Sequence, residues 1–206
     1  MISVVIPAFN EGKNIWRVLS VLKRIDLIDE IIVVNDGSTD DTKEQALKYN
    51  VKLVDLPKNQ GKGKALKAGI ENSKGDIIVM LDADLIGLTE KHFFNLISPV
   101  LKDEADMTIG IFSGGRKSTD FAQKIAPFLS GQRAIKRQFL ENIEEMEISR
   151  FGVEIALNRH AEKNKLRVVN VPLENMSHVM KEEKLGLIRG FYARLKMYFD
   201  ILKMWI

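Results

Sequence analysis

The sequence contains no cysteine, and this absence excludes several kinds of chemistry. A chain without thiols cannot form disulfides, use a thiolate nucleophile or hold zinc through cysteine ligands. No uninterrupted apolar run reaches the roughly 18–20 residues that a helix needs to cross a bilayer. The first residues, MISVVIPAFNEG, also lack the basic lead and long apolar stretch of a signal peptide. We therefore expect a cytoplasmic protein without a membrane-spanning segment.

A strong charge of either sign is also missing. The chain has 31 Lys and Arg residues against 28 Asp and Glu residues, which gives a net charge of +3 at pH 7. Nucleic-acid binding usually depends on a dense basic patch, so this small excess argues against a nucleic-acid partner. The 206 residues contain no internal repeat and no low-complexity linker. This length suits a single α/β domain covering residues 1–206.

The first half of the chain alternates strand and helix patterns. Short apolar, β-branched runs predict strands over 2–6, 31–34, 51–54 and 77–81. Helical spacing begins at Ile15, helix-start residues stand at 38–41, and a third helix is predicted over 62–72. Continuous apolar strands that alternate with helices are typical of a mostly parallel sheet covered on both faces.

The second half is less regular. We predict a helix over 89–101, a strand over 107–112 and a polar, glycine-rich loop over 113–120. Further helices are expected over 133–143 and 153–163, and a late strand over 166–171 is expected to stop at Pro172. A long amphipathic helix should begin near residue 182.

Three polar loops are expected at one edge of this sheet. PAFNEG follows the first strand, NDGSTD the second and DADL the fourth, and open parallel sheets bind ligands at the carboxyl ends of their strands. The first loop lacks a Gly-x-Gly-x-x-Gly pattern and the stretch KNQGKGKAL lacks P-loop spacing. These absences argue against a dinucleotide-dependent dehydrogenase and against a P-loop protein.

Asp82 and Asp84 are the sharpest chemical feature of these loops. Two carboxylates one residue apart at the end of a buried strand can share Mg²⁺ or Mn²⁺, which prefer oxygen ligands and often bridge to phosphates. The alternative is a solvated turn. His178, in a polar stretch beyond Pro172, could supply a third ligand or could be an ordinary exposed histidine.

Several other loop residues have both a functional and a structural interpretation. Asp36 could accept the ring N–H of a uracil-like base or cap a helix, and Asn10 and Glu11 could cap the first helix or bind a ribose or base. Lys62 stands at a helix start, where phosphate is attracted, but could be a surface lysine. Glu154 could contact an acceptor, act as a base or complement a helix dipole.

The motifs SVVIPAFNEGKNI, IIVVNDGSTDDT, GKGKALKAG and DIIVMLDADL together resemble family 2 glycosyltransferases, which have the GT-A fold. The resemblance continues in SGQRAIKRQFLE, FGVEIALNRHA and RVVNVPLENMSH. It implies a GT-A-like, Rossmann-like sheet with a nucleotide-sugar half at 1–112, an acceptor half at 113–181 and a C-terminal helix at 182–206. The implied reaction is transfer of a sugar from a UDP- or GDP-sugar.

The resemblance also implies roles for individual residues. The nucleoside would lie against Pro7, Ala8, Asn10, Glu11 and Asp36, and Lys62 would lie near the diphosphate. Asp82, Ala83 and Asp84 match the D-x-D motif, with His178 completing the site for Mg²⁺ or Mn²⁺. Glu154 and Asp84 would be the catalytic residues, with Glu154 facing the acceptor.

The acceptor stays open between two subgroups that the sequence resembles. These are the polyprenyl-phosphate sugar transferases and the glucosyl-3-phosphoglycerate and mannosylglycerate synthases. The acceptor is therefore expected to carry a phosphate, and to be either a polyprenyl phosphate or a small phosphoglycerate-like molecule. Four cationic residues are candidates for gripping that phosphate: Arg116, Lys117, Arg133 and Arg137. The C-terminal helix could pack on its own domain, join a second subunit in a homodimer, or lie on a membrane surface.

Two other functions compete with glycosyl transfer. A sugar-phosphate nucleotidyltransferase also binds nucleotides on an α/β sheet, but it usually carries a glycine-rich, arginine-containing loop after the first strand, which PAFNEG does not resemble. A non-catalytic nucleotide-sugar-binding module would not need the Asp82, Asp84 and His178 set.

Overall fold

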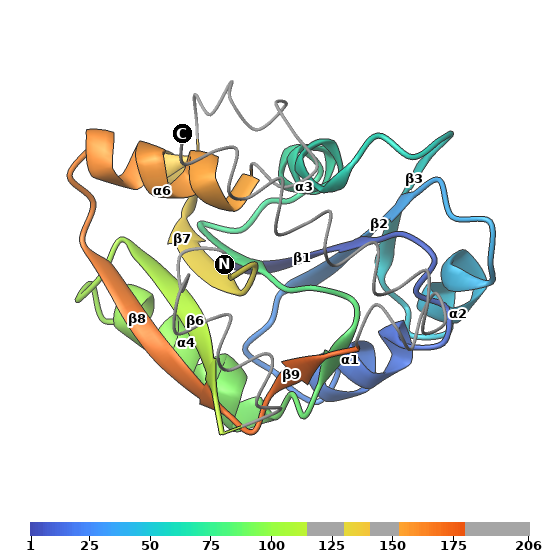
Figure 1. Cartoon of the computed structure of the whole chain (residues 1–206), viewed down its shortest axis with the longest axis horizontal. Coiled ribbons are helices and arrows are strands. Elements are labelled where there is room, and N and C mark those ends of the chain that lie inside the picture. Colours follow the sequence, from blue (N-terminus) through green and yellow to red (C-terminus); the bar gives the residue numbers. More distant parts are fainter. Residues whose placement is uncertain (115–129, 141–152, 180–206) are drawn as a thin grey trace, which may run out of the picture.

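A central sheet of seven strands organises the computed structural model, which describes residues 1–114, 130–140 and 153–179 (Figure 1). The strand order is β3-β2-β1-β4-β7-β6-β8. The four strands of the first half are parallel to one another: β1 (Ile2–Ala8), β2 (Glu30–Asp36), β3 (Lys52–Leu56) and β4 (Ile77–Met80). The mostly parallel sheet expected from the sequence is thus confirmed.

The second half adds three strands and corrects two predictions. They are β6 (Met107–Ser113), β7 (Arg133–Lys136) and β8 (Val168–Glu174), and β7 is antiparallel to both β4 and β6. The helix predicted from Arg133 is therefore wrong, because sheet pairing overrides local helix propensity there, and only the 3₁₀ helix η2 (Arg137–Phe139) follows. Strand β8 also continues through Pro172. Among the described residues it is an edge strand that pairs with β6 alone, and a proline's missing N–H is tolerated at such an edge.

Helices cover both faces of the sheet, as Figure 1 shows. On one face α1 (Ile15–Leu22), α2 (Thr42–Leu47) and α4 (Glu90–Leu101) enclose a hydrophobic cluster that contains Val4, Ile6 and Val33. On the other face α3 (Lys62–Glu71) and α6 (Val153–Lys163) enclose Val5, Ile32 and Val34. Successive strand residues alternate between two buried faces, which explains why the strands read as continuous apolar runs.

Helix α3 packs very close to the sheet at Gly69. A Cβ atom on this residue would lie 2.3 Å from Val5 Cγ1 and 3.0 Å from Val34 Cγ2. Only glycine permits this approach without a shift of the neighbours. The close packing sets the height of α3 above β1 and β2, and so places its first residue, Lys62, over the carboxyl edge of the sheet.

A small second sheet brings the late part of the chain back to the same edge. Strand β5 (Leu85–Ile86) pairs antiparallel with β9 (Ser177–His178), and Val179 N donates to Asp84 O at 3.1 Å. Residues 115–120 of the predicted loop and the predicted helix from residue 182 lie outside the described residues. Within the described ranges, no helix combines the length and apolarity required to cross a membrane.

Asp106 ties the three strands of the second half together. Its carboxylate accepts hydrogen bonds from Arg167 N at 2.9 Å, from Arg167 Nη2 at 2.8 Å and from Lys136 Nζ at 3.0 Å. The hydrogen bonds from Arg167 hold the pKa of Asp106 well below its ordinary value of 3.8, even though burial opposes this. The carboxylate therefore stabilises the fold while it is ionised.

We predict that Asp106→Asn lowers the free energy of unfolding at pH 7 by about 1–3 kcal/mol, because hydrogen bonds to a charged acceptor are lost. A lowered folded-state pKa gives stability that is present above the unfolded pKa and is lost as pH falls below it. The difference between wild type and variant should thus be constant above about pH 5 and shrink below about pH 4. Urea unfolding at several pH values measures it, and a difference that does not change with pH would contradict the assignment.

Candidate active site

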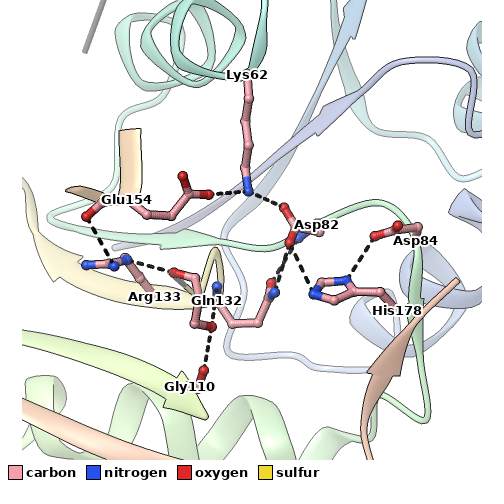
Figure 2. A network of polar contacts seen from close by, with 9 residues as sticks. Lys62, Asp82, Asp84, Gly110, Gln132, Arg133, Glu154 and His178 are labelled. Atoms are coloured by element: carbon pink, nitrogen blue, oxygen red, sulfur yellow. Dashed lines mark hydrogen bonds and ion pairs between the residues drawn. The ribbon is translucent and has the colours of Figure 1, made fainter. Parts of the chain in front are cut away.

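Side chains from distant parts of the chain meet beyond the ends of β1, β2 and β4 (Figure 2). Lys62 comes from the start of α3, Asp82 and Asp84 from the loop after β4, Glu154 from the first turn of α6 and His178 from β9. All of these were candidates in the sequence, and the structure brings them into one cluster. The parallel sheet brings Lys62, Asp82 and Asp84 to one edge, and the pairing of β9 with β5 brings His178 to them.

Lys62 lies between two carboxylates. Its Nζ is 2.6 Å from Asp82 Oδ1 and 2.7 Å from Glu154 Oε1. Burial alone would lower the pKa of Lys62, but the negative charges of Asp82 and Glu154 outweigh burial and raise it. Burial likewise opposes ionisation of Asp82, and the Lys62 ammonium nevertheless lowers the pKa of that carboxyl. Lys62 and Asp82 are thus both charged at neutral pH.

Asp82, Asp84 and His178 form a compact set of metal-ligand types. One ligand atom from each of the three lies within 4.8 Å of the other two. His178 Nδ1 is 3.2 Å from Asp84 Oδ1, and its Nε2 is 3.9 Å from Asp82 Oδ2. Burial is the largest single effect on His178 and lowers its pKa, but the hydrogen bond to Asp84 and the negative charges of Asp84 and Asp82 together outweigh burial and raise it. Two carboxylates and an imidazole fit Mg²⁺ or Mn²⁺, with Mn²⁺ the better match to nitrogen.

The segment Ser130–Gln132 is a part of the site that the sequence analysis did not identify. The Gln132 side chain is fully buried; its Nε2 donates to Asp82 Oδ2 at 2.9 Å and its Oε1 accepts from Asp82 N at 3.1 Å. Gly131 lies beside the ion pair, where a Cβ atom would be 2.5 Å from Lys62 Nζ. Pairing of Met80 with Arg133 places this segment next to the D-x-D loop. That register becomes visible only when 133–136 is recognised as a strand.

Arg133 and Arg137 do not lie where the sequence analysis expected. Arg133 is buried, and its guanidinium donates to Ser130 O at 3.0 Å and to Asn158 Oδ1 at 2.7 Å. Arg137 donates to Gly75 O and Ser73 Oγ. Both acceptors precede β4, so Arg137 lies at the end of that strand away from Asp82 and Asp84. The expectation that these two arginines grip an acceptor phosphate is wrong, because both bind parts of the fold. Arg116 and Lys117 lie outside the described residues.

The residues expected around a nucleoside join the first two loops. Asn10 Oδ1 accepts from Thr39 N at 2.9 Å, and the Glu11 carboxylate accepts from Asn14 Nδ2 at 2.9 Å. Asp36 is buried and accepts from Gln60 N at 2.7 Å and Gly61 N at 2.9 Å. Its carboxylate thus holds the turn that carries Lys62. Pro7 and Ala8 end β1, with Ala8 buried, and Ala83 is buried in the core between the two aspartates.

The chain is similar in sequence to one protein family and to individual members of it. The family model for Glycosyl transferase family 2 matches residues 3–157. Glucosyl-3-phosphoglycerate synthase from Mycobacterium tuberculosis is 31% identical over 193 residues, covering 76% of this chain and 59% of that protein. A dolichyl-phosphate beta-glucosyltransferase from Trichomonas vaginalis is 36% identical over 146 residues, covering 63% of this chain and 45% of that protein. The chain therefore spans about half of the length of these relatives.

Solved structures of the mycobacterial synthase have the same fold. The complex with Mn²⁺, UDP and glucosyl-3-phosphoglycerate superimposes with a TM-score of 0.71 at 30% identity and covers 87% of this chain and 72% of that one. The complex with Mg²⁺ and UDP also gives a TM-score of 0.71, at 29% identity, and covers 87% of this chain and 71% of that one. The mixed α/β sheet and its flanking helices are thus those of GT-A enzymes.

We predict that Gly131→Ala forces Lys62 away from Asp82 and costs about 1–3 kcal/mol of stability through overpacking. A double-mutant cycle with Lys62→Ala tests this, because truncation of the lysine removes the nearest atom that the new methyl group would meet. Urea unfolding of the four proteins should show that Gly131→Ala costs less in the Lys62→Ala background. Equal costs in both backgrounds would place the collision elsewhere.

Proposed function

The chain belongs to glycosyl transferase family 2, and we propose that it transfers a sugar from a UDP- or GDP-sugar to a phosphate-bearing acceptor with Mg²⁺ or Mn²⁺. The observation that carries the proposal is the cluster of Asp82, Asp84 and His178 directly beside Lys62. This arrangement combines ligands for a divalent cation with a fixed positive charge, and both suit a diphosphate leaving group.

The metal would be held by Asp82, Asp84 and His178, which present oxygen and nitrogen donors from two segments of the chain. When bound, the cation neutralises charge that develops on a departing diphosphate. Lys62 adds a second positive charge next to Asp82 Oδ1, whereas His178 lies next to Asp82 Oδ2. Because its side chain is held by Asp82 and Glu154, the ammonium is positioned before the donor arrives, which avoids the cost of ordering a flexible lysine.

The nucleoside would lie against the first two loops, with Pro7, Ala8, Asn10, Glu11 and Asp36 nearby. The contacts between Asn10 and Thr39 and between Asp36 and the turn at 60–61 support a preformed surface there. A carboxylate oxygen can accept more than one hydrogen bond. Asp36 can therefore hold that turn and still accept the ring N–H of a base.

Glu154 would face the acceptor. Its Oε1 is engaged by Lys62, so the residue also serves to anchor the ammonium. A hydroxyl acceptor needs a base to take its proton, whereas a phosphate acceptor is already ionised and needs little such help. Glu154 would therefore accept the proton of a hydroxyl on a phosphoglycerate-like acceptor, whereas beside a polyprenyl phosphate it would act only by position.

The relatives supply the acceptor class. Their names include phosphoglycerate and dolichyl phosphate as acceptors, and both carry a phosphate. We further propose a donor half at 1–112 and an acceptor half at 113–181, with Arg116 and Lys117 as cationic candidates for the acceptor phosphate. The C-terminal segment, 182–206, would either contact a membrane surface or join a second subunit of a cytoplasmic protein.

We predict that Asp84→Ala abolishes metal-dependent turnover without unfolding the protein. Loss of several kcal/mol of metal-assisted stabilisation lowers the rate by at least about 100-fold. Release of UDP or GDP from nucleotide sugars measures turnover, and the thermal unfolding midpoint serves as the control. Full activity in the variant would remove Asp84 from the metal site.

A donor-by-acceptor panel tests the acceptor proposal. UDP-glucose and GDP-mannose are each combined with 3-phosphoglycerate, glycerate and polyprenyl phosphate in the presence of Mn²⁺. We expect a sugar product with one of the phosphorylated acceptors and none with glycerate. Formation of a nucleotide sugar from a sugar phosphate would instead indicate a nucleotidyltransferase, and nucleotide binding without any turnover would indicate a binding module.

A further inference from the structure

Gln132 makes two hydrogen bonds to a single residue of the metal-ligand set. Its Oε1 accepts from Asp82 N at 3.1 Å, and its Nε2 donates to Asp82 Oδ2 at 2.9 Å (Figure 2). A backbone N–H can only donate and a carboxylate can only accept, so both ends of the amide have a fixed orientation. The amide therefore holds the backbone and the side chain of Asp82 at once.

The position of Gln132 explains why such a contact is needed. Strand β4 ends at Met80, and Leu81 N still donates to Val5 O at 3.2 Å, but Asp82 N donates to the Gln132 side chain. The Gln132 side chain thus replaces a strand carbonyl as the acceptor for the backbone N–H at the point where the chain leaves the sheet. Without it, a backbone N–H would lose its partner where the D-x-D loop begins.

Gln132 is itself held firmly. Its backbone O accepts from Gly110 N at 2.8 Å, its backbone N donates to Ser130 Oγ at 3.3 Å, and its side chain is fully buried. The adjacent Arg133 donates to Ser130 O, which closes the turn. An amide with so little freedom can orient a neighbouring carboxylate rather than follow it.

The two oxygens of Asp82 are consequently assigned to different neighbours. Oδ1 faces Lys62 at 2.6 Å, while Oδ2 receives Gln132 and lies 3.9 Å from His178 Nε2. A rotation of the carboxylate would break the Lys62 contact and move Oδ2 away from His178. We propose that Gln132 is a positioning residue that presents Asp82 Oδ2 to the divalent cation and Oδ1 to Lys62. This inference deepens the proposed function and rests on it for its catalytic part.

The test compares Gln132→Met with a matched control. Met has a similar volume but can neither accept from Asp82 N nor donate to Oδ2. The control is Thr108→Val on β6, which removes buried hydrogen bonds to Leu96 O at 2.7 Å and from Ala134 N at 3.3 Å, neither of which involves Gln132, Asp82, Asp84 or His178. Both variants are expected to be less stable than wild type, so stability alone cannot produce a difference between them.

Mn²⁺ alone is the probe, and electron paramagnetic resonance measures its affinity without donor or acceptor. We expect Gln132→Met to weaken Mn²⁺ binding and to lower kcat, each by about 10–100-fold, as for other residues that orient a metal ligand. Thr108→Val should retain the wild-type Mn²⁺ affinity. Wild-type affinity in Gln132→Met, with only a lower unfolding midpoint, would reduce Gln132 to a structural role and overturn the inference.

A second variant covers the case in which Gln132→Met does not fold. Gln132→Asn keeps a buried amide but is one methylene shorter and cannot reach both atoms of Asp82. It should bind Mn²⁺ at least about 10-fold more weakly, and full affinity would overturn the two-point contact. Wild-type protein that binds Mn²⁺ but turns over no nucleotide sugar would count against the proposed function alone, because the effect on Mn²⁺ affinity is measured separately.

Discussion

The site is built around a lysine that is held between two acids. Lys62 contacts Asp82 and Glu154 at once, and a largely buried ion pair persists only when each charge has a partner. The three residues belong to α3, to the loop after β4 and to α6, so the contact also joins elements from both halves of the chain. Removing the charge of Lys62 would leave Asp82 and Glu154 without their shared cationic partner in a region shielded from water.

Strand β7 and the residue before it contact both acids of this ion pair. At its start, Gln132 holds Asp82 through the side-chain amide. The next residue, Arg133, is a buried guanidinium whose Nη2 donates to the Glu154 carbonyl at 3.4 Å and whose Nη1 donates to Asn158. The first residue of β7 and the residue before it therefore fix the two elements that carry the acids. These contacts are made from the point where a strand of opposite direction is inserted between β4 and β6.

The sequence was most informative where local pattern and burial agree. The apolar runs of β1, β2 and β4 are buried on both faces, so the parallel sheet and the place of Asp82 and Asp84 at its carboxyl edge could be predicted. His178 was expected beside them only through the family resemblance, because it reaches the site by pairing of β9 with β5. Strand β7 could not be predicted, because RAIKR contains good helix formers and is a strand only through pairing with β4 and β6. Missing β7 also concealed Gln132 and made Arg133 look like a surface cation.

The charges of the cluster constrain how a donor can bind. Asp82, Asp84 and Glu154 place three carboxylates around Lys62 and His178, and Arg133 lies on the far side of Glu154. A diphosphate approaching these side chains by themselves would be repelled, and burial strengthens that repulsion. A divalent cation on Asp82, Asp84 and His178 would reverse the sign of the charge facing the diphosphate. Under the proposed function, a cation on these ligands and the Lys62 ammonium would together face the diphosphate of the donor, with Lys62 already held in place by Asp82 and Glu154.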